Sequence, residues 1–265
     1  MTEKIDLPQQ LHSLGLVKRT WPETLAAIKA ALPPADLEKF TRAHKNFVAY
    51  RSETTLSRFY GTVFSLGIQA LVNGYRYGRL LQVLEDLLPA LTPGMKVLDV
   101  GAGGGYIATL AMRHRSPAAY YVQDNCAAVR DELTAQGFTV LPHPAPATAP
   151  IQGGFDRILC VDSVGELNGD DDGQLARPGG VPEAELPEQM EERYGFAQKL
   201  EAWKPFLARG GRILLWEPFN FPDAYRAVGS YLGRKGWNAE VANPAASRYH
   251  LSLSAENPGP AEQAP

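Results

Sequence analysis

Two aspartates and a run of glycines between them are the residues of this chain best placed to bind a ligand. The stretch Val97–Tyr106 reads V-L-D-V-G-A-G-G-G-Y, and a second acid, Asp124, ends the next apolar segment. Glycine has no Cβ atom, so such a run lets the backbone turn sharply and approach a bound molecule closely. An acid roughly 20 residues beyond a glycine turn is typical of sites that bind the ribose of a nucleoside cofactor. The spacing therefore predicts a nucleoside-binding site.

The glycine spacing separates three kinds of nucleotide site. A dinucleotide fingerprint, G-x-G-x-x-G, needs glycine at position 106, but tyrosine stands there and the third glycine is Gly105. Asp99 also stands at the end of the preceding apolar run, where a strand buried on both faces is usually apolar. A Walker phosphate loop is excluded because no Gly-Lys-Ser/Thr segment follows the glycines. The pattern that remains is D-x-G-x-G-x-G.

Short apolar runs after Gly94 predict the elements that position these residues. The first five runs alternate with helical segments, which indicates parallel strands with helices on both faces. Too few residues separate the last two runs for a crossover helix, so these strands should be antiparallel. The expected strands are 96–100, 119–124, 138–142, 156–162, 211–217, 239–242 and 249–254. We therefore expect an α/β fold with a doubly wound, mostly parallel seven-stranded sheet and an antiparallel last strand.

The chain before this sheet has a helical pattern from Thr20 to Leu91. Thr20 is typical of an N-cap, and Pro22 of a first helical turn. Apolar residues three or four apart form the expected buried stripes: Leu25, Ile28, Leu32, Leu37, Phe40 and Phe47. We expect a helical extension over 1–91, a cofactor-binding domain over 92–256, a long loop over 168–187 and a disordered tail over 257–265.

The D-x-G-x-G-x-G stretch resembles the first motif of class I S-adenosylmethionine-dependent methyltransferases. Asp124 matches the acid that this family places after the next strand, and the resemblance extends roughly from Leu91 to Ala255. It implies a methyltransferase that uses S-adenosylmethionine and methylates a small molecule or, alternatively, a protein side chain. The residues implied to bind the cofactor are Asp99, Gly101, Ala102, Gly103, Gly105, Asp124, Asn125 and Asp162.

The chain departs from the family after the third expected strand. The family commonly places there an acid that binds the adenine amino group, but this chain has no Asp or Glu between Leu141 and Asp156. Adenine would then be bound by backbone groups, by Thr148 or by Gln152.

Three residues are candidates for acid–base chemistry. Asp162 and Glu166 follow the fourth expected strand, at the carboxyl edge of the sheet, where ligands bind in open α/β folds. Capping or orienting the following loop is the alternative role for both. His143 lies in a proline-rich connector and is a further candidate base, with simple surface exposure as the alternative.

Two other segments have ambiguous patterns. Tyrosines and arginines cluster before the glycine stretch, where they could form an acceptor pocket or pack the helices onto the sheet: Tyr60, Tyr75, Arg76, Tyr77 and Arg79. The stretch Asn168–Gly173 matches half of a calcium-binding loop, but position twelve is Gly179 rather than glutamate. We therefore expect no metal.

Composition limits the partners and the location. The 26 basic and 29 acidic residues give a net charge of −3, which disfavours nucleic acid as a partner. The two cysteines define no disulfide framework. No apolar run is long enough to cross a membrane or resembles a signal peptide, so we expect a cytoplasmic protein. The sequence does not indicate an oligomeric state.

Two other functions stay open at this stage. The missing adenine acid favours a non-catalytic protein that keeps the methyltransferase fold as a binding or interaction module. A nicotinamide-dependent oxidoreductase would have to accommodate the shifted glycines.

Overall fold

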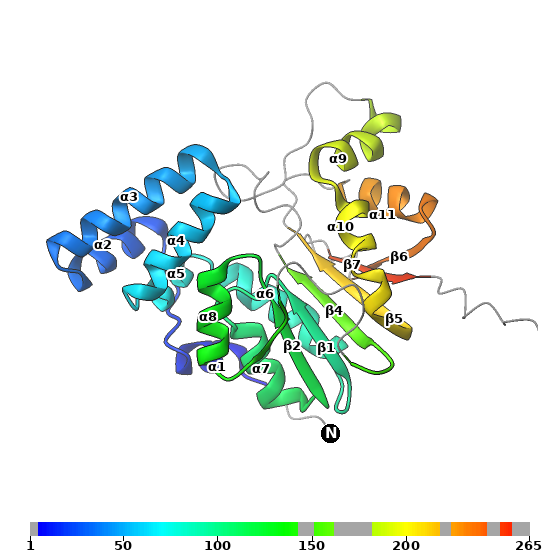
Figure 1. The fold of residues 1–265 in the computed structure, drawn as a ribbon, viewed down its shortest axis with the longest axis horizontal. Helices are drawn as coiled ribbons and strands as arrows, with labels where there is room; N and C mark the ends of the chain where they lie inside the picture. The colour runs from blue at the N-terminus through cyan, green and yellow to red at the C-terminus, as the bar shows by residue number, and fades with distance from the viewer. Residues whose placement is uncertain (1–4, 143–150, 162–181, 218–223, 243–249, 256–265) are drawn as a thin grey trace, which may run out of the picture. The chain divides into compact units, whose positions relative to one another are not determined.

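A computed structural model describes residues 5–142, 151–161, 182–217, 224–242 and 250–255. The order of its elements can be followed in Figure 1. The α-helices are α1 Leu7–Ser13, α2 Trp21–Ala31, α3 Pro34–Tyr50, α4 Glu53–Ser65, α5 Gln69–Tyr75, α6 Tyr77–Leu87, α7 Tyr106–Arg115, α8 Ala127–Ala135, α9 Leu186–Tyr194, α10 Phe196–Glu201 and α11 Ala224–Arg234. The strands are β1 Lys96–Val100, β2 Ala119–Gln123, β3 Thr139–Val140, β4 Phe155–Val161, β5 Leu207–Trp216, β6 Trp237–Ala242 and β7 His250–Ala255. Three short 3-10 turns complete them: η1 Leu88–Ala90, η3 Glu183–Glu185 and η4 Lys204–Phe206.

The strands form one sheet in the order β3-β2-β1-β4-β5-β7-β6. Pairing is parallel between β2 and β3, between β1 and β4, and between β4 and β5. Strand β7 runs antiparallel to both β5 and β6. The α/β fold, the parallel strands in the order 3-2-1-4-5 and the N-terminal helical region are therefore confirmed.

Strand β5 begins earlier than the sequence pattern predicted. It starts at Leu207 rather than at residue 211, because its two glycines form an irregularity inside the strand. Gly210 has a φ of 75°, and the register with β4 shifts in this region. A Cβ on Gly211 would lie 2.6 Å from the Phe155 carbonyl oxygen, so only glycine fits the close approach of the two strands.

Two helical segments also differ from the prediction. Helix α1 was not expected, although Asp6 caps it by accepting from the Gln9 N–H at 3.1 Å and Pro8 lies in its first turn. The loop expected over 168–187 is wrong at its end, because α9 begins at Leu186 and contains Pro187. Proline is compatible with the first turn of a helix, where its missing N–H would have no partner in any case. Residues 168–181 lie outside the described residues.

The chain divides into two compact units. One comprises Met1–Gly94 and Ala102–His143, and the other comprises Met95–Gly101 and Pro144–Pro265. The first contains α1 to α8 with β2 and β3, and the second contains the remaining strands with α9, α10 and α11. The domain boundary expected after residue 91 stays a prediction.

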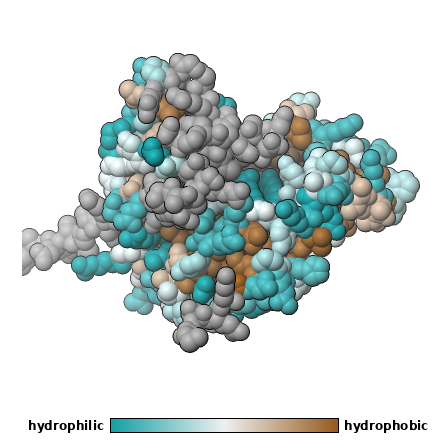
Figure 2. All heavy atoms as spheres, turned by 180° about the vertical axis from the view of Figure 1, so that it is seen from behind, coloured by the Kyte–Doolittle hydropathy of each residue, from teal (hydrophilic) through white to brown (hydrophobic). Residues whose placement is uncertain are grey.

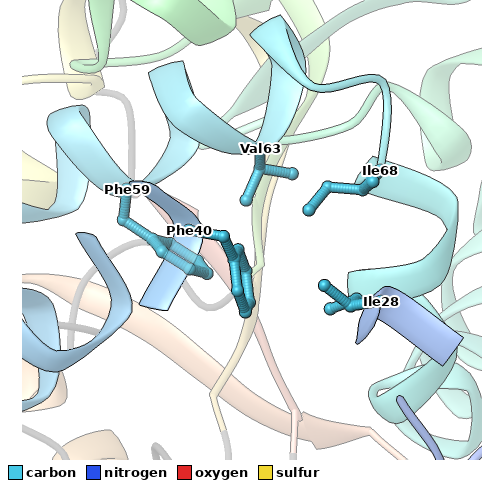
Figure 3. Packing of buried hydrophobic residues seen from close by; sticks show 5 residues of the cluster. All are labelled: Ile28, Phe40, Phe59, Val63 and Ile68. Carbon is cyan, nitrogen blue, oxygen red and sulfur yellow. The ribbon is translucent and has the colours of Figure 1, made fainter. Parts of the chain in front are cut away.

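A separate apolar cluster stabilises the N-terminal helices of the first unit. Its fully buried members come from α2, α3, α4 and the start of α5, and Figure 3 shows them pointing toward one another: Ile28, Phe40, Phe59, Val63 and Ile68. The expected stripe residues Leu25, Leu32, Leu37 and Phe47 pack against this cluster. Helix α2 begins with the expected Thr20 cap, which Glu23 completes as a capping box.

The second unit has much of its core in the central strands of the sheet. The carboxyl-terminal halves of β4 and β5 are buried and apolar, and β1 is buried from Val97 to Val100, as expected for parallel strands covered on both faces. Helix α11 packs on α9 and on β6.

The face of the molecule drawn in Figure 2 is mainly hydrophilic where it is coloured. Figure 2 shows one face, on which apolar residues are confined to limited areas. Within the described ranges, no helix combines the length and apolar character needed to span a bilayer.

Candidate functional site

The glycine turn between β1 and α7 contains three residues with left-handed backbone. Gly101, Gly103 and Gly105 have φ angles of 75°, 53° and 74°. Such angles cost an ordinary residue about 1–2 kcal/mol, whereas glycine adopts them readily. The Gly105 N–H donates to the Ala102 carbonyl at 3.0 Å, and α7 begins at the next residue, Tyr106. The alternating glycines therefore follow from the conformation of the turn itself.

Close packing is a second reason for glycine in this turn. A Cβ on Gly105 would lie 2.8 Å from Gln136 Oε1 and 3.0 Å from Leu133 Cδ2. A Cβ on Gly104 would lie 2.7 Å from Cε2 of the Tyr106 ring. The end of α8 and the Tyr106 ring thus pack directly on the turn.

Asp124 follows β2 and binds the turn through its carboxylate. Its Oδ2 accepts from the Gly103 N–H at 3.2 Å, and its Oδ1 accepts from the Cys126 N–H at 2.8 Å. The residue is only 7% exposed, so these hydrogen bonds replace water around the carboxylate. A carboxylate has about four acceptor positions, which leaves capacity for the hydroxyl groups of a ligand. Asp124 therefore links the glycine turn to the start of α8.

Backbone groups around Asp124 are held by further hydrogen bonds. The Arg130 Nη1 of α8 donates to the carbonyls of Asp124 and Asn125, at 2.8 Å each. The Ala102 N–H donates to the Gln123 carbonyl at 3.3 Å. The Asn125 residue itself is exposed. These hydrogen bonds thus fix the backbone on both sides of Asp124.

The start of α7 is suited to an anionic group. Among the described residues, no side chain caps this helix, whose N-cap residue is Gly105. The first N–H groups of a helix have no partner within the helix and carry the positive end of its dipole. A carboxylate or phosphate placed there would be bound by these groups.

Asp99 belongs to the second unit, as the fourth residue of β1. It is fully buried, with 0% exposure, and lies opposite Leu159 of β4 in the sheet register. Burying a carboxylate inside a sheet costs free energy that packing alone does not return. Its expected contact with a cofactor stays a prediction.

Several of the sequence-based candidates cannot be placed. His143, Thr148, Asp162 and Glu166 lie outside the described residues, so the expected catalytic roles stay predictions. Gln152 is exposed, and its carbonyl accepts from Lys96 Nζ at 2.8 Å. In the parts of the chain that the structure describes, no group of His, Cys, Asp or Glu side chains could hold a metal ion.

Two of the clustered tyrosines, Tyr60 and Tyr75, pack against neighbouring aromatic rings. The ring centroids of Tyr60 and Phe64 lie 6.1 Å apart, and those of Tyr75 and Trp21 lie 5.5 Å apart in an edge-on arrangement. These contacts favour the packing role over an acceptor pocket.

Two polar residues of the helical region contact the site and were not expected from the sequence. The Asn73 side chain of α5 hydrogen-bonds to the Tyr106 side chain, and the Cys126 Sγ donates to Ser57 Oγ of α4 at 3.4 Å. Burial raises the pKa of Tyr106, and the Asn73 bond partly opposes this rise. Both contacts join residues far apart in the chain, for which the sequence pattern carries no signal.

The fold and the turn together define a doubly wound α/β protein with a glycine turn at the first strand–helix junction. No protein-family model and no curated protein sequence matches the chain. Solved structures do match it, and they identify the fold as the class I, Rossmann-like fold of S-adenosylmethionine-dependent methyltransferases.

Three of these structures illustrate the match. A DhpI–SAH complex covers 75% of this chain and 94% of its own, with a TM-score of 0.50 and 15% identity. Magnesium protoporphyrin IX methyltransferase from Synechocystis PCC 6803 with bound SAM covers 65% and 76%, with a TM-score of 0.40 and 15% identity. An S-adenosylhomocysteine complex of a SAM-dependent methyltransferase from Bacteroides fragilis covers 65% and 76%, with a TM-score of 0.42 and 14% identity. Identities this low concern the fold alone.

Proposed function

We propose that the protein is a methyltransferase that uses S-adenosylmethionine and methylates a small molecule. The observation that carries this proposal is the hydrogen bond from the Gly103 N–H to the Asp124 carboxylate. It joins the two features on which the family resemblance depends, the glycine turn and the acid after the second strand. The fold shared with the DhpI–SAH complex supports the same cofactor.

Each part of the site suits a different part of this cofactor. The uncapped start of α7 would bind the methionine carboxylate. Asp124 would accept hydrogen bonds from the ribose hydroxyls, and Asp99 from the methionine ammonium, directly or through water. Gly101, Ala102, Asn125 and Asp162 complete the proposed contacts. When bound, the cofactor supplies an electrophilic methyl group on a positively charged sulfur. Nearby carboxylates favour the binding of this positive charge.

The residues around the acceptor have one main task. Methyl transfer is an in-line displacement, so the acceptor atom must be aligned with the methyl carbon. A general base is needed only where the acceptor keeps its proton at neutral pH. We keep Asp162, Glu166 and His143 as the candidates for that role.

Ligand binding to the full chain tests the cofactor. Thermal unfolding is followed with S-adenosylmethionine, S-adenosylhomocysteine or NAD⁺ added at the same millimolar concentration. A ligand at roughly 100 times its Kd stabilises the folded state by about 2.7 kcal/mol, which raises the unfolding midpoint measurably. We expect the two adenosyl ligands to raise it and NAD⁺ to leave it unchanged. A rise with NAD⁺ alone would support an oxidoreductase, and no rise with any ligand would support a non-catalytic module.

Labelled cofactor tests the class of acceptor. The protein is incubated with methyl-labelled S-adenosylmethionine and either a dialysable metabolite extract or the dialysed protein fraction of a lysate. We expect protein-dependent label in small molecules. Label confined to the protein fraction would replace this acceptor class with a protein side chain.

A further inference from the structure

The ring of Tyr106 covers the glycine turn. Tyr106 is the first residue of α7, and the space beside Gly104 is closed by this ring and by one neighbouring amide. A Cβ on Gly104 would lie 2.7 Å from Tyr106 Cε2 and 3.4 Å from Asn73 Nδ2. Gly104 is not among the glycines with positive φ, so lack of space rather than backbone conformation explains why it is glycine.

Asn73 holds this ring from the N-terminal helices. Its side chain hydrogen-bonds to the Tyr106 side chain, which is half-buried. The backbone next to it is fixed, because the Gly74 carbonyl accepts from the Arg19 N–H at 3.1 Å. A Cβ on Gly74 would lie 2.6 Å from the Val17 carbonyl oxygen, so α5 packs tightly against the segment that precedes α2. Asn73 therefore acts from a rigid position.

Helix α4 makes a second contact, with the segment that follows β2 and contains Asp124. Ser57 Oγ accepts from Cys126 Sγ at 3.4 Å, and the N–H of that cysteine is bound by the Asp124 carboxylate. Nearby, a Cβ on Gly61 would lie 3.5 Å from Ala128 Cβ, which places α4 directly against α8. The α4–α5 pair thus contacts the site both at the glycine turn and after β2.

We propose that Asn73 is a positioning residue of the cofactor site, holding Tyr106 over the glycine turn so that the start of α7 is preorganised for its ligand. The inference rests on the proposed function, since it concerns the same cofactor. Preorganisation raises affinity because less ordering remains to be done on binding. Linkage is reciprocal, so cofactor binding must in turn stabilise the α4–α5 pair through the Asn73–Tyr106 contact.

Affinity and hydrogen exchange on the full chain test this inference. The variants are Asn73→Ala, Tyr106→Phe, which keeps the ring, and the double variant, with Asn46→Ala on the exposed face of α3 as control. Loss of one neutral hydrogen bond weakens S-adenosylhomocysteine binding by about three- to tenfold. We expect this loss in each single variant, no further loss in the double variant and none in the control.

Hydrogen exchange distinguishes positioning from simple stabilisation. In the wild type, saturating S-adenosylhomocysteine should slow amide exchange in α4 and α5, and Asn73→Ala should remove this slowing while exchange in α7 still responds. Wild-type affinity in both single variants, or no ligand response in α4 and α5, would overturn the inference while leaving the proposed function intact. Failure of the wild type to bind the ligand at all would instead reject the proposed function, and the inference with it.

Discussion

Asp124 is the residue whose removal should most affect both the stability of the turn and the binding of a cofactor. Its carboxylate accepts two backbone hydrogen bonds, from Gly103 at 3.2 Å and from Cys126 at 2.8 Å, in a nearly buried position. A hydrogen bond to a charged group contributes about 1.5–3 kcal/mol, and a buried N–H left without a partner costs a similar amount. Asp124→Ala removes both bonds, so we expect the free energy of unfolding to fall by about 3–5 kcal/mol.

Asp124→Asn removes the negative charge of the side chain but keeps its shape, so it separates the contributions of the two to stability. The amide keeps one acceptor oxygen but turns an N–H₂ group toward a backbone donor, so about half of the loss should remain, roughly 1.5–3 kcal/mol. Both variants are compared by urea unfolding. With a slope of about 3 kcal/mol/M, the Ala variant should lower the urea midpoint by roughly 1–1.7 M. Asp131→Asn, an exposed carboxylate on α8, is the matched control and should leave the midpoint unchanged.

Affinity provides the second measurement on the same variants. Loss of the ribose hydrogen bonds should weaken S-adenosylhomocysteine binding by about 1.5–3 kcal/mol, or about 10- to 150-fold, as measured by calorimetry under conditions where the variant is folded. If Asp124→Ala had the same urea midpoint as the wild type, the two hydrogen bonds of Asp124 would not stabilise the fold as argued from the structure. A folded variant with unchanged affinity would remove Asp124 from the cofactor site.

Two further perturbations follow from the structure. Gly105→Ala should destabilise the protein by more than Gly137→Ala in thermal unfolding. Both glycines have positive φ, which alone costs an alanine about 1–2 kcal/mol. At Gly105 the new Cβ would also lie 2.8 Å from Gln136 Oε1, whereas a Cβ on Gly137 would face open space. Equal losses in the two variants would show that α8 does not pack on the turn. Burial among the rings of Trp21 and its neighbours lowers the pKa of His44 below its usual 6.5. Folding therefore favours the neutral imidazole. The stability that depends on this neutral form is present above about pH 6.5 and is lost as the pH falls below it. The unfolding midpoint of the wild type should therefore drop more steeply from about pH 7 to about pH 5.5 than that of His44→Gln, and parallel curves would contradict this.

Local patterns were sufficient to predict most of the fold. The N-cap of α2 depends on Thr20 and Pro22, and its buried face on residues spaced three or four apart, so both can be seen within a short window of sequence. The parallel strands are visible for the same reason, as short apolar runs. Errors occurred where local signals conflict: β5 continues through Gly210 because the neighbouring strand accommodates an irregularity, and α9 contains Pro187 in its first turn.

Local sequence features were enough to predict the glycine turn and its acidic partner. Glycines at 101, 103 and 105 are required by the backbone conformation of the turn, and an acid after the next strand is a local feature as well. The contacts that join these parts could not be predicted in this way, because they depend on tertiary packing. The carboxylate of Asp124 reaches the Gly103 N–H, and the Asn73 and Tyr106 side chains meet beside Gly104, because packing brings together segments that are distant in the chain. Such contacts depend on the complementary shapes of whole elements, so neither composition nor periodicity contains them.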